Sequence, residues 1–284
     1  MTPPVPAPLH GLPLTALGAA MIRAQESRRP DPLYADPWAQ RFLDAAEPAY
    51  RGPTAPAGAA ETWTRLQAMA EAMYEGRTIG VRLVDDDLTT WVAAGNRQIV
   101  LLGAGLDSHA FRLDWPGPAR LFEVDLPPIF GFKEPVLAAA RATPVCERHL
   151  IAADLTGSWA ETLVGGGFRS DEPTCWIDHA TPFMPRQAAH SSATVITELS
   201  APASTYSYPF MAARAVSASL QSVSRPQSLR HDDAGETGLG AGGRDLLESL
   251  GWTTDFEPFP ETAARYGRAL AADAESGTVR ATRL

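Results

Sequence analysis

A glycine turn at the end of an apolar run is the feature of this sequence best suited to chemistry. The run Gln98–Gly103 is followed directly by Ala104 and Gly105. An apolar run that ends in glycine is typical of a buried parallel strand, and glycines in the turn let a ligand approach the backbone closely. A helix that begins at Leu106 would point its N-terminus at that ligand. The sequence therefore predicts a small-molecule site at this turn.

The next apolar run adds a carboxylate to the same site. The segment FEVD ends at Asp125, which follows Gly105 by 20 residues. A carboxylate at this distance after a glycine turn is placed to accept hydrogen bonds from both hydroxyls of a ribose. The turn and Asp125 together predict a cofactor that contains a nucleoside.

The residues after Gly105 distinguish between two such cofactors. A dinucleotide-binding turn needs a third glycine at position 108, where this sequence has Ser108. Asp107 would repel a pyrophosphate, whereas it would attract the sulfonium and ammonium groups of S-adenosylmethionine (SAM). We therefore expect SAM as the cofactor, with S-adenosylhomocysteine (SAH) as its product.

A third apolar run supplies a candidate for the recognition of adenine. The segment RHLIAADL ends in Asp154 and Leu155. Here the Asp154 carboxylate and the neighbouring backbone would hydrogen-bond the adenine amino group. Asp154 would equally serve as the N-cap of a helix over residues 158–163, so both interpretations remain open at this point.

The order of apolar and helical segments predicts the fold class. From residue 98 onward, apolar runs alternate with helical stretches, as in a doubly wound parallel α/β sheet. Strands are expected within the segments 98–103, 119–125, 148–155, 173–178, 200–210, 253–259 and 277–284.

The first 95 residues show helical patterns only. Helices are expected over 15–26, over 37–46 with Asp36 and Pro37 at its start, and near 59–74 and 81–94. We interpret residues 1–95 as a helical cap integral to the domain, and residues 96–284 as the SAM-binding core. Residues 1–13 are expected to be loosely ordered, and residues 222–242 to form a mobile loop.

Composition excludes several classes of protein. The 284 residues carry a net charge of −9, and 45% of them are hydrophobic. Without a Lys/Arg tract, nucleic-acid binding has little support. Cys146 and Cys175 lack the spacing of metal ligands, so we expect free thiols and no metal. The absence of a signal sequence and of an 18-residue apolar run favours a cytoplasmic protein without membrane contact. The oligomeric state stays open.

Several parts of the sequence together resemble the leucine carboxyl methyltransferase family and its bacterial relatives. The motif GAGLDS-x-AFRL joined to FEVD-x-P carries the resemblance, with RAQESRRPDPLYADPWAQRFL before it and LLESLGW after it. The similarity runs from about residue 12 to residue 270. It implies a seven-stranded, Rossmann-like methyltransferase sheet with a helical lid, and SAM-dependent O-methyltransferase activity. It also implies cofactor contacts from Gly103, Asp125, Asp154 and Leu155.

The sequence departs from the family pattern near the methionine end of the cofactor. Where the family has an arginine that grips the SAM carboxylate, this chain has Gly80, and Arg77 lies one turn earlier as a substitute. Position 109 is His109 where the family has arginine. Arg112 is kept, and we assign it with Ala104, Gly105, Asp107 and Arg77 to cofactor binding.

The residues after the fourth expected strand are the catalytic candidates. The family has an acidic residue here, and either Asp178 or His179 takes its place. If the methyl acceptor is an alcohol or a phenol, it needs a general base, and His179 alone or with Asp178 would serve. A carboxylate acceptor is ionised at neutral pH and needs none. A capping or surface histidine is the simpler alternative.

These observations predict a SAM-dependent O-methyltransferase whose acceptor is a small-molecule carboxylate or hydroxyl, such as a natural product. The departures at the methionine end support an alternative, a methyltransferase fold that binds SAM but catalyses another reaction, such as a cyclisation. An apolar pocket for that reaction would come from an aromatic cluster, although the same residues would fit an ordinary core. The cluster comprises Trp176, Phe183, Met184, Tyr206, Tyr208 and Phe210.

Overall fold

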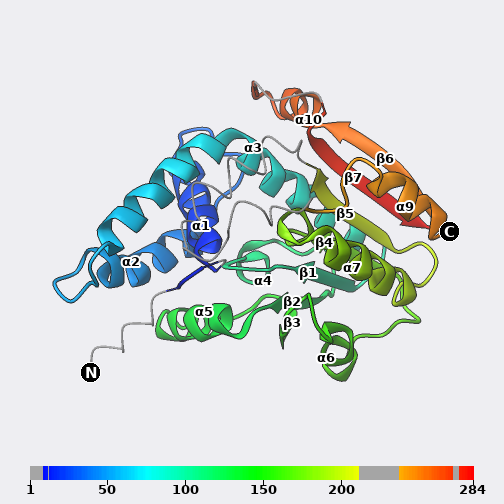
Figure 1. The fold of residues 1–284 in the computed structure, drawn as a ribbon, viewed down its shortest axis with the longest axis horizontal. Coiled ribbons are helices and arrows are strands. Elements are labelled where there is room, and N and C mark those ends of the chain that lie inside the picture. Colours follow the sequence, from blue (N-terminus) through cyan, green and yellow to red (C-terminus); the bar gives the residue numbers. More distant parts are fainter. Residues whose placement is uncertain (1–8, 12, 211–236, 271–274) are drawn as a thin grey trace.

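A seven-stranded sheet forms the centre of the described chain (Figure 1). The computed structural model describes residues 9–11, 13–210, 237–270 and 275–284. The sheet has the strand order β3-β2-β1-β4-β5-β7-β6. Its strands are β1 (Gln98–Leu102), β2 (Arg120–Asp125), β3 (Glu147–Ala152), β4 (Thr174–Asp178), β5 (Thr205–Phe210), β6 (Trp252–Pro258) and β7 (Gly277–Arg283).

The central strands place the predicted site residues together at the carboxyl ends of the strands. β1 is buried along its whole length and pairs in parallel with β2 on one side and β4 on the other. Leu102 lies in register with both Val124 and Asp178, so the glycine turn, Asp125 and His179 follow neighbouring strand ends. The strand order reverses between β1 and β4, which is where open α/β sheets bind ligands. The doubly wound fold predicted from the sequence is confirmed, but the sheet is mixed rather than parallel throughout, because β7 pairs antiparallel with β5 and β6.

Three helices precede the sheet and lie together beside it (Figure 1). They are α1 (Leu14–Glu26), α2 (Pro37–Arg51) and α3 (Ala59–Ala93). Asp36 caps α2 as expected, because its carboxylate accepts hydrogen bonds from the backbone N–H groups of Trp38 and Ala39.

The remaining helices connect or follow the strands. They are α4 (His109–Arg112), α5 (Pro127–Ala139), α6 (Trp159–Gly165), the 3₁₀ turn η1 (Thr181–Phe183), α7 (Arg186–Glu198), α9 (Gly243–Ser249) and α10 (Phe259–Arg265). The helix expected from Leu106 is thus only four residues long and begins at His109. So short a helix adds little dipole to the site.

Two helices were expected near 59–74 and 81–94, and this prediction was wrong. The structure has one helix of 35 residues, which continues through Gly76 and Gly80. Glycine in a helix costs about 1 kcal/mol relative to alanine, which is why the sequence suggests a break. Between the two glycines, Thr78 and Ile79 are fully buried. Packing of this face outweighs the local preference.

Three consecutive acids anchor the C-terminal part of α3 to three different elements. Asp85 is buried against α4, Asp86 accepts a hydrogen bond from a tyrosine beyond α10, and Asp87 pairs with an arginine of β7. The closest contacts are Asp85–Arg112 at 2.6 Å, Asp86–Tyr266 at 2.8 Å and Asp87–Arg280 at 3.2 Å. These contacts fix where α3 lies relative to the strand ends.

Two expectations fall wholly or largely on residues that the structure does not describe. They are the loosely ordered segment 1–13, of which only 9–11 and 13 are described, and the mobile loop 222–242, of which only 237–242 are described. Within the described ranges, no helix is both long and apolar enough to cross a membrane.

Gly103→Ala should destabilise the protein. Gly103 has φ 70°, and a Cβ atom there would lie 3.0 Å from the Cβ of Ala180. The left-handed backbone alone costs a residue with a Cβ about 1–2 kcal/mol, and the contact adds to it. Urea unfolding would measure this loss. The matched control is Gly131→Ala in α5, where a Cβ meets nothing within 4 Å, and which should stabilise by about 0.5–1 kcal/mol. Equal stability of Gly103→Ala and wild type would contradict the prediction.

Candidate active site

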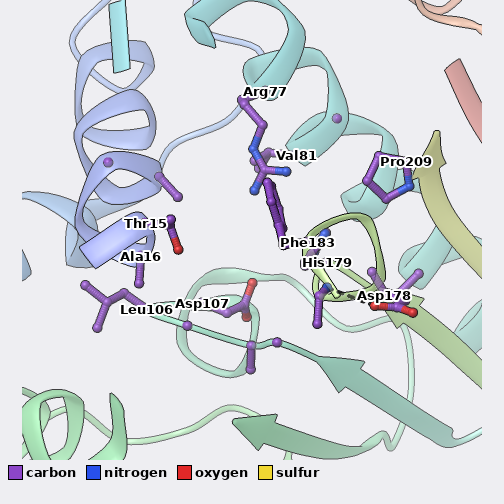
Figure 2. A pocket seen from close by; sticks show the side chains of 18 of the residues that line it. Thr15, Ala16, Arg77, Val81, Leu106, Asp107, Asp178, His179, Phe183 and Pro209 are labelled. Carbon is purple, nitrogen blue, oxygen red and sulfur yellow. Dashed lines mark hydrogen bonds between the residues drawn. The ribbon is translucent and has the colours of Figure 1, made fainter. Parts of the chain in front are cut away.

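A cavity of about 990 Å³ lies between the carboxyl ends of the strands and the helices α1 and α3 (Figure 2). Its volume is at the upper end of the range for small-molecule sites, so it has room for two ligands. The predicted site residues that line it are Gly103, Ala104, Gly105, Asp107, Asp125, Asp154, Leu155, Arg77, Asp178 and His179.

The glycines of the turn are required by protein packing as well as by backbone conformation. Gly105 has φ 53°, and a Cβ there would lie 3.3 Å from the Cβ of Ala16 in α1. A Cβ on Gly103 would likewise lie 3.0 Å from the Cβ of Ala180. From the sequence, we expected these glycines to be needed for the approach of a ligand. The structure shows that they also let α1 and the loop after β4 pack against the turn.

Asp125 joins the glycine turn to the end of β2. Its carboxylate accepts hydrogen bonds from the backbone N–H groups of Gly105 at 2.6 Å and Leu126 at 2.7 Å. Burial raises the pKa of Asp125, and these two bonds oppose the rise. A carboxylate has about four acceptor sites, so two remain for a ligand in the cavity.

Asp154 does not cap the following helix. Its carboxylate accepts hydrogen bonds from the backbone N–H and the hydroxyl of Thr156, at 2.8 and 2.7 Å. The helix α6 begins at Trp159 and has Ser158 at its N-cap. The capping alternative is therefore wrong, and Asp154 and Leu155 line the cavity beyond Asp125.

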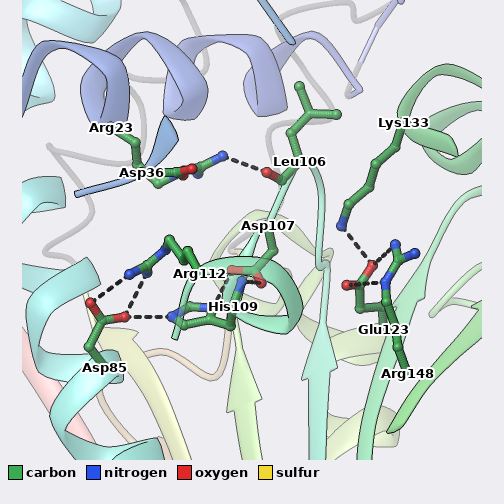
Figure 3. Close-up of polar contacts among 10 residues, drawn as sticks. All are labelled: Arg23, Asp36, Asp85, Leu106, Asp107, His109, Arg112, Glu123, Lys133 and Arg148. Atoms are coloured by element: carbon green, nitrogen blue, oxygen red, sulfur yellow. Dashed lines mark hydrogen bonds and ion pairs between the residues drawn. The ribbon is translucent and has the colours of Figure 1, made fainter. Parts of the chain in front are cut away.

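A buried histidine lies between two carboxylates behind the turn (Figure 3). His109 contacts Asp107 through Nδ1 at 2.5 Å and Asp85 through Nε2 at 2.8 Å. Only an imidazolium can donate a hydrogen bond to both. Burial opposes the charge of the ring, but Asp107 and Asp85 raise the pKa of His109 to about 8. Asp107 is correspondingly held as an anion, with its pKa well below the usual range despite burial.

The structure does not support a cofactor contact from Arg112. Its guanidinium donates two hydrogen bonds to Asp85, at 2.9 and 2.6 Å, and lies over the ring of Tyr34. Arg112 is absent from the cavity lining among the described residues. It anchors α3 to α4 instead.

Arg77 extends from α3 into the cavity, towards His179 and Phe183 (Figure 2). Within the described part of the chain, its guanidinium has neither an ion-pair partner nor a hydrogen bond to another side chain. Burial and the charge of Arg23 lower the pKa of Arg77. A guanidinium placed in this way is suited to an anionic ligand group.

Asp178 is fully engaged by the protein. Its carboxylate accepts hydrogen bonds from the backbone N–H groups of Ala180 and Thr181, from the Thr181 hydroxyl and from the Tyr206 hydroxyl. Burial raises the pKa of Asp178, and these bonds oppose the rise. Asp178 thus shapes the turn after β4 and has little capacity left for a ligand.

His179 follows Asp178 in the chain and differs from it in hydrogen bonding. Its backbone N–H donates to the carbonyl of Leu102, and its Nδ1 is buried without a hydrogen-bond partner. Burial and the charge of Arg77 lower the pKa of His179 to about 3. The ring is therefore neutral at physiological pH, as expected, but it is a much weaker base than an ordinary histidine, and the sequence gives no sign of this.

Sequence reasoning missed two residues that organise the site. Arg23 of α1 lines the cavity and donates hydrogen bonds to Asp36 at 2.7 Å and to the carbonyl of Leu106 at 2.6 Å (Figure 3). Asp85 holds His109 and Arg112. Neither has a local sequence signal, because its partners lie on other elements. A second buried cluster, Glu123 with Lys133 and Arg148, does not line the cavity.

The aromatic cluster proposed for an apolar pocket is divided. Trp176 and Tyr206 are fully buried core residues outside the cavity lining. Phe183, Met184 and Tyr208 do line the cavity. No group of three or more potential metal ligands occurs in the described ranges.

Comparisons with known proteins give consistent findings. A model of the leucine carboxyl methyltransferase family matches residues 16–197. A provisionally named S-adenosyl-L-methionine-dependent methyltransferase of Frankia alni is 38% identical over 96% of this chain and 95% of its own length. A similarly named protein of Saccharopolyspora erythraea is 33% identical over 92% and 90%. Another, of a Parafrankia strain, is 46% identical over 68% of this chain, and that match spans only 61% of its length.

Solved structures share the fold. A DUF574 family protein of Streptomyces avermitilis aligns with a TM-score of 0.56 at 13% identity, over 86% of this chain and 96% of that one. A Thermobifida fusca protein, provisionally described as a methyltransferase, aligns with a TM-score of 0.51 at 14% identity, over 86% and 93%. At these identities the likeness shows the fold alone.

The charged state of His109 predicts a pH-dependent contribution to stability. Its pKa in the folded protein is raised to about 8, so its contribution is complete below the unfolded pKa of about 6.5 and is lost as pH rises through 8. The shift corresponds to about 2 kcal/mol. The difference in unfolding free energy between wild type and His109→Gln should therefore shrink by about this amount between pH 6 and pH 9.

A constant difference for His109→Gln across this pH range would mean that His109 is not held as an imidazolium.

Proposed function

This chain belongs to the leucine carboxyl methyltransferase family, and we propose that it transfers a methyl group from SAM to a carboxylate oxygen of a small molecule. SAM dependence follows from the family and its relatives. The carboxylate acceptor is our inference from the cavity. It narrows the choice between carboxylate and hydroxyl that the sequence left open.

The side chains of the cavity fit the chemical groups of SAM. Asp125 has free acceptor sites for the ribose hydroxyls, and Asp154 with Leu155 lies beyond it, where adenine would bind. Arg77 offers an uncompensated guanidinium for the carboxylate, and the anionic Asp107 suits the ammonium group. Arg77 thus fills the role of the arginine that the family has at the position of Gly80.

We favour a carboxylate as the acceptor because the described cavity residues lack a general base. Outside the cofactor contacts, no described side chain of the cavity is both accessible and able to take a proton near neutral pH. His179 has a pKa of about 3, and Asp178 is occupied by four donors. His109 has both ring nitrogens engaged, and burial raises the pKa of Tyr208 far above neutrality. An acceptor that arrives already ionised needs none of them.

The proposed reaction is a direct displacement. SAM supplies a methyl group on a positively charged sulfur, which is already an activated donor. The acceptor oxygen forms a bond to the methyl carbon as the carbon–sulfur bond breaks, and sulfur keeps the electron pair, so that SAH and a methyl ester result without proton transfer. The protein contributes orientation of the two reactants and exclusion of water.

Two other reactions would differ from this proposal in ways that an experiment can detect. Methylation of a hydroxyl would need a base, and a non-methylating reaction would leave no methyl group in any product. A cytoplasmic location and a natural-product acceptor belong to the proposal as further expectations.

Arg77→Gln should weaken SAH binding about 10- to 100-fold, because a charge-assisted hydrogen bond contributes about 1.5–3 kcal/mol. Gly80 faces open space, with nothing within 4 Å of an added Cβ. Gly80→Arg should therefore restore binding in the Arg77→Gln background. Calorimetry would measure both. The control is Arg65→Gln, an exposed arginine of α3 at the cavity rim. Loss of affinity in Arg65→Gln but not in Arg77→Gln would contradict the assignment.

His179→Gln should lower methyl transfer by less than about tenfold, whereas loss of a general base costs about 10²–10⁴-fold. Because the pKa of His179 is about 3, the wild-type rate should not fall between pH 8 and pH 5.5 through ionisation of this residue. Transfer of tritiated methyl groups from SAM to carboxylic acids would measure both. A loss of 100-fold or more, with a rate that falls below about pH 6.5, would indicate a hydroxyl acceptor instead.

A further inference from the structure

We propose that the methyl acceptor is an apolar monocarboxylic acid whose hydrocarbon or aryl body lies in one lobe of the cavity. We call this part the apolar lobe and define it by Val81, Phe183, Pro209 and Phe259. The inference rests on the proposed function and specifies its substrate class.

The apolar lobe is separate from the part of the cavity that fits the cofactor. In Figure 2, Ala16 and Leu106 lie to the left of Arg77, the ring of Phe183 lies below its guanidinium, and Pro209 lies to the right. Asp125 is bonded to Gly105, which packs against Ala16, so the ribose contact belongs to the side of Ala16. The side of Pro209 remains for another ligand.

Three elements that are distant in the sequence form the walls of the apolar lobe. Val81 comes from α3, Phe183 from η1 and Pro209 from β5 (Figure 2). Phe259 adds a further aromatic wall from the first residue of α10, a helix that contacts α3. A half-buried apolar surface of this kind binds hydrocarbon groups, because binding removes apolar area of the wall and of the ligand from water.

The charges around the lobe limit the acceptor to one anionic group. Among the residues that the structure describes, the apolar lobe contains no charged side chain, and the nearby polar side chains of Ser207 and Thr278 are neutral hydroxyls. Asp178 at its border is occupied by protein donors. One carboxylate can point towards the sulfonium of SAM, but a second would be buried in the lobe without a cationic partner among the described residues. An unpaired buried charge is strongly unfavourable.

A matched pair of acids tests the inference on the full-length wild-type protein. Hexanoic acid and adipic acid have the same six-carbon chain and differ by one terminal carboxylate. With tritiated-methyl SAM, kcat/KM for hexanoate should exceed that for adipate by at least about 100-fold. Octanoate and 3-phenylpropanoate should be accepted in the same way as hexanoate, because their bodies are also uncharged.

A substitution in the lobe gives a second, independent readout. Val81→Lys would supply a cation for the second carboxylate, so the adipate-to-hexanoate ratio of kcat/KM should rise at least about tenfold. Val81→Leu keeps the lobe apolar and should leave the ratio unchanged. Calorimetry with SAH on both variants would separate acceptor recognition from cofactor binding.

The failures of the two proposals can be told apart. Equal turnover of adipate and hexanoate by the wild type would overturn the apolar lobe as the acceptor site, while carboxylate methylation would stand. An unchanged ratio in Val81→Lys, with SAH bound normally, would also overturn it. Binding of SAH without methylation of any acid in the series would overturn both the proposed function and this inference.

Discussion

The buried carboxylate of Asp85 is the interaction on which the arrangement of the cavity depends. It accepts two hydrogen bonds from Arg112 and one from His109, and so it joins the long helix α3 to the turn after β1. Removal of one partner from such a buried cluster costs about 3–5 kcal/mol, because a charge is left without compensation. Arg77 lies two turns away on the same rigid helix, so the position of its guanidinium follows from this anchor.

His109 extends the anchor from α3 to the cavity itself. Because its ring is charged, it holds Asp107 as an anion at the cavity wall while it also pairs with Asp85. His109 thus stabilises the negative charge of Asp107 in the cofactor site without having to contact the ligand. The long helix α3 and the glycine turn are parts of one charged network (Figure 3).

The distribution of charge divides the cavity into two chemically different parts. The strand ends contribute carboxylates, and α3 contributes one uncompensated arginine, which together suit a charged cofactor. Val81, Phe183 and Pro209 contribute apolar walls beside the occupied Asp178, which suits the body of a singly charged acceptor (Figure 2). In the proposed reaction, the weakly basic His179 and the occupied Asp178 are consistent with an acceptor that brings its own charge.

Local patterns in the sequence determined the strands, the doubly wound fold and the edge of the sheet that holds the site. Buried apolar runs, the Asp36 cap and the carboxylate at Asp125 are readable because they depend on near neighbours and on strand direction. The continuous helix α3 was not readable, since its glycines are overridden by packing against distant elements. Only the tertiary structure decided the partners and pKa values of Arg112, Asp178 and His179. Those depend on Asp85, Tyr206 and Arg77, which are far away in sequence and meet these residues only when the chain folds.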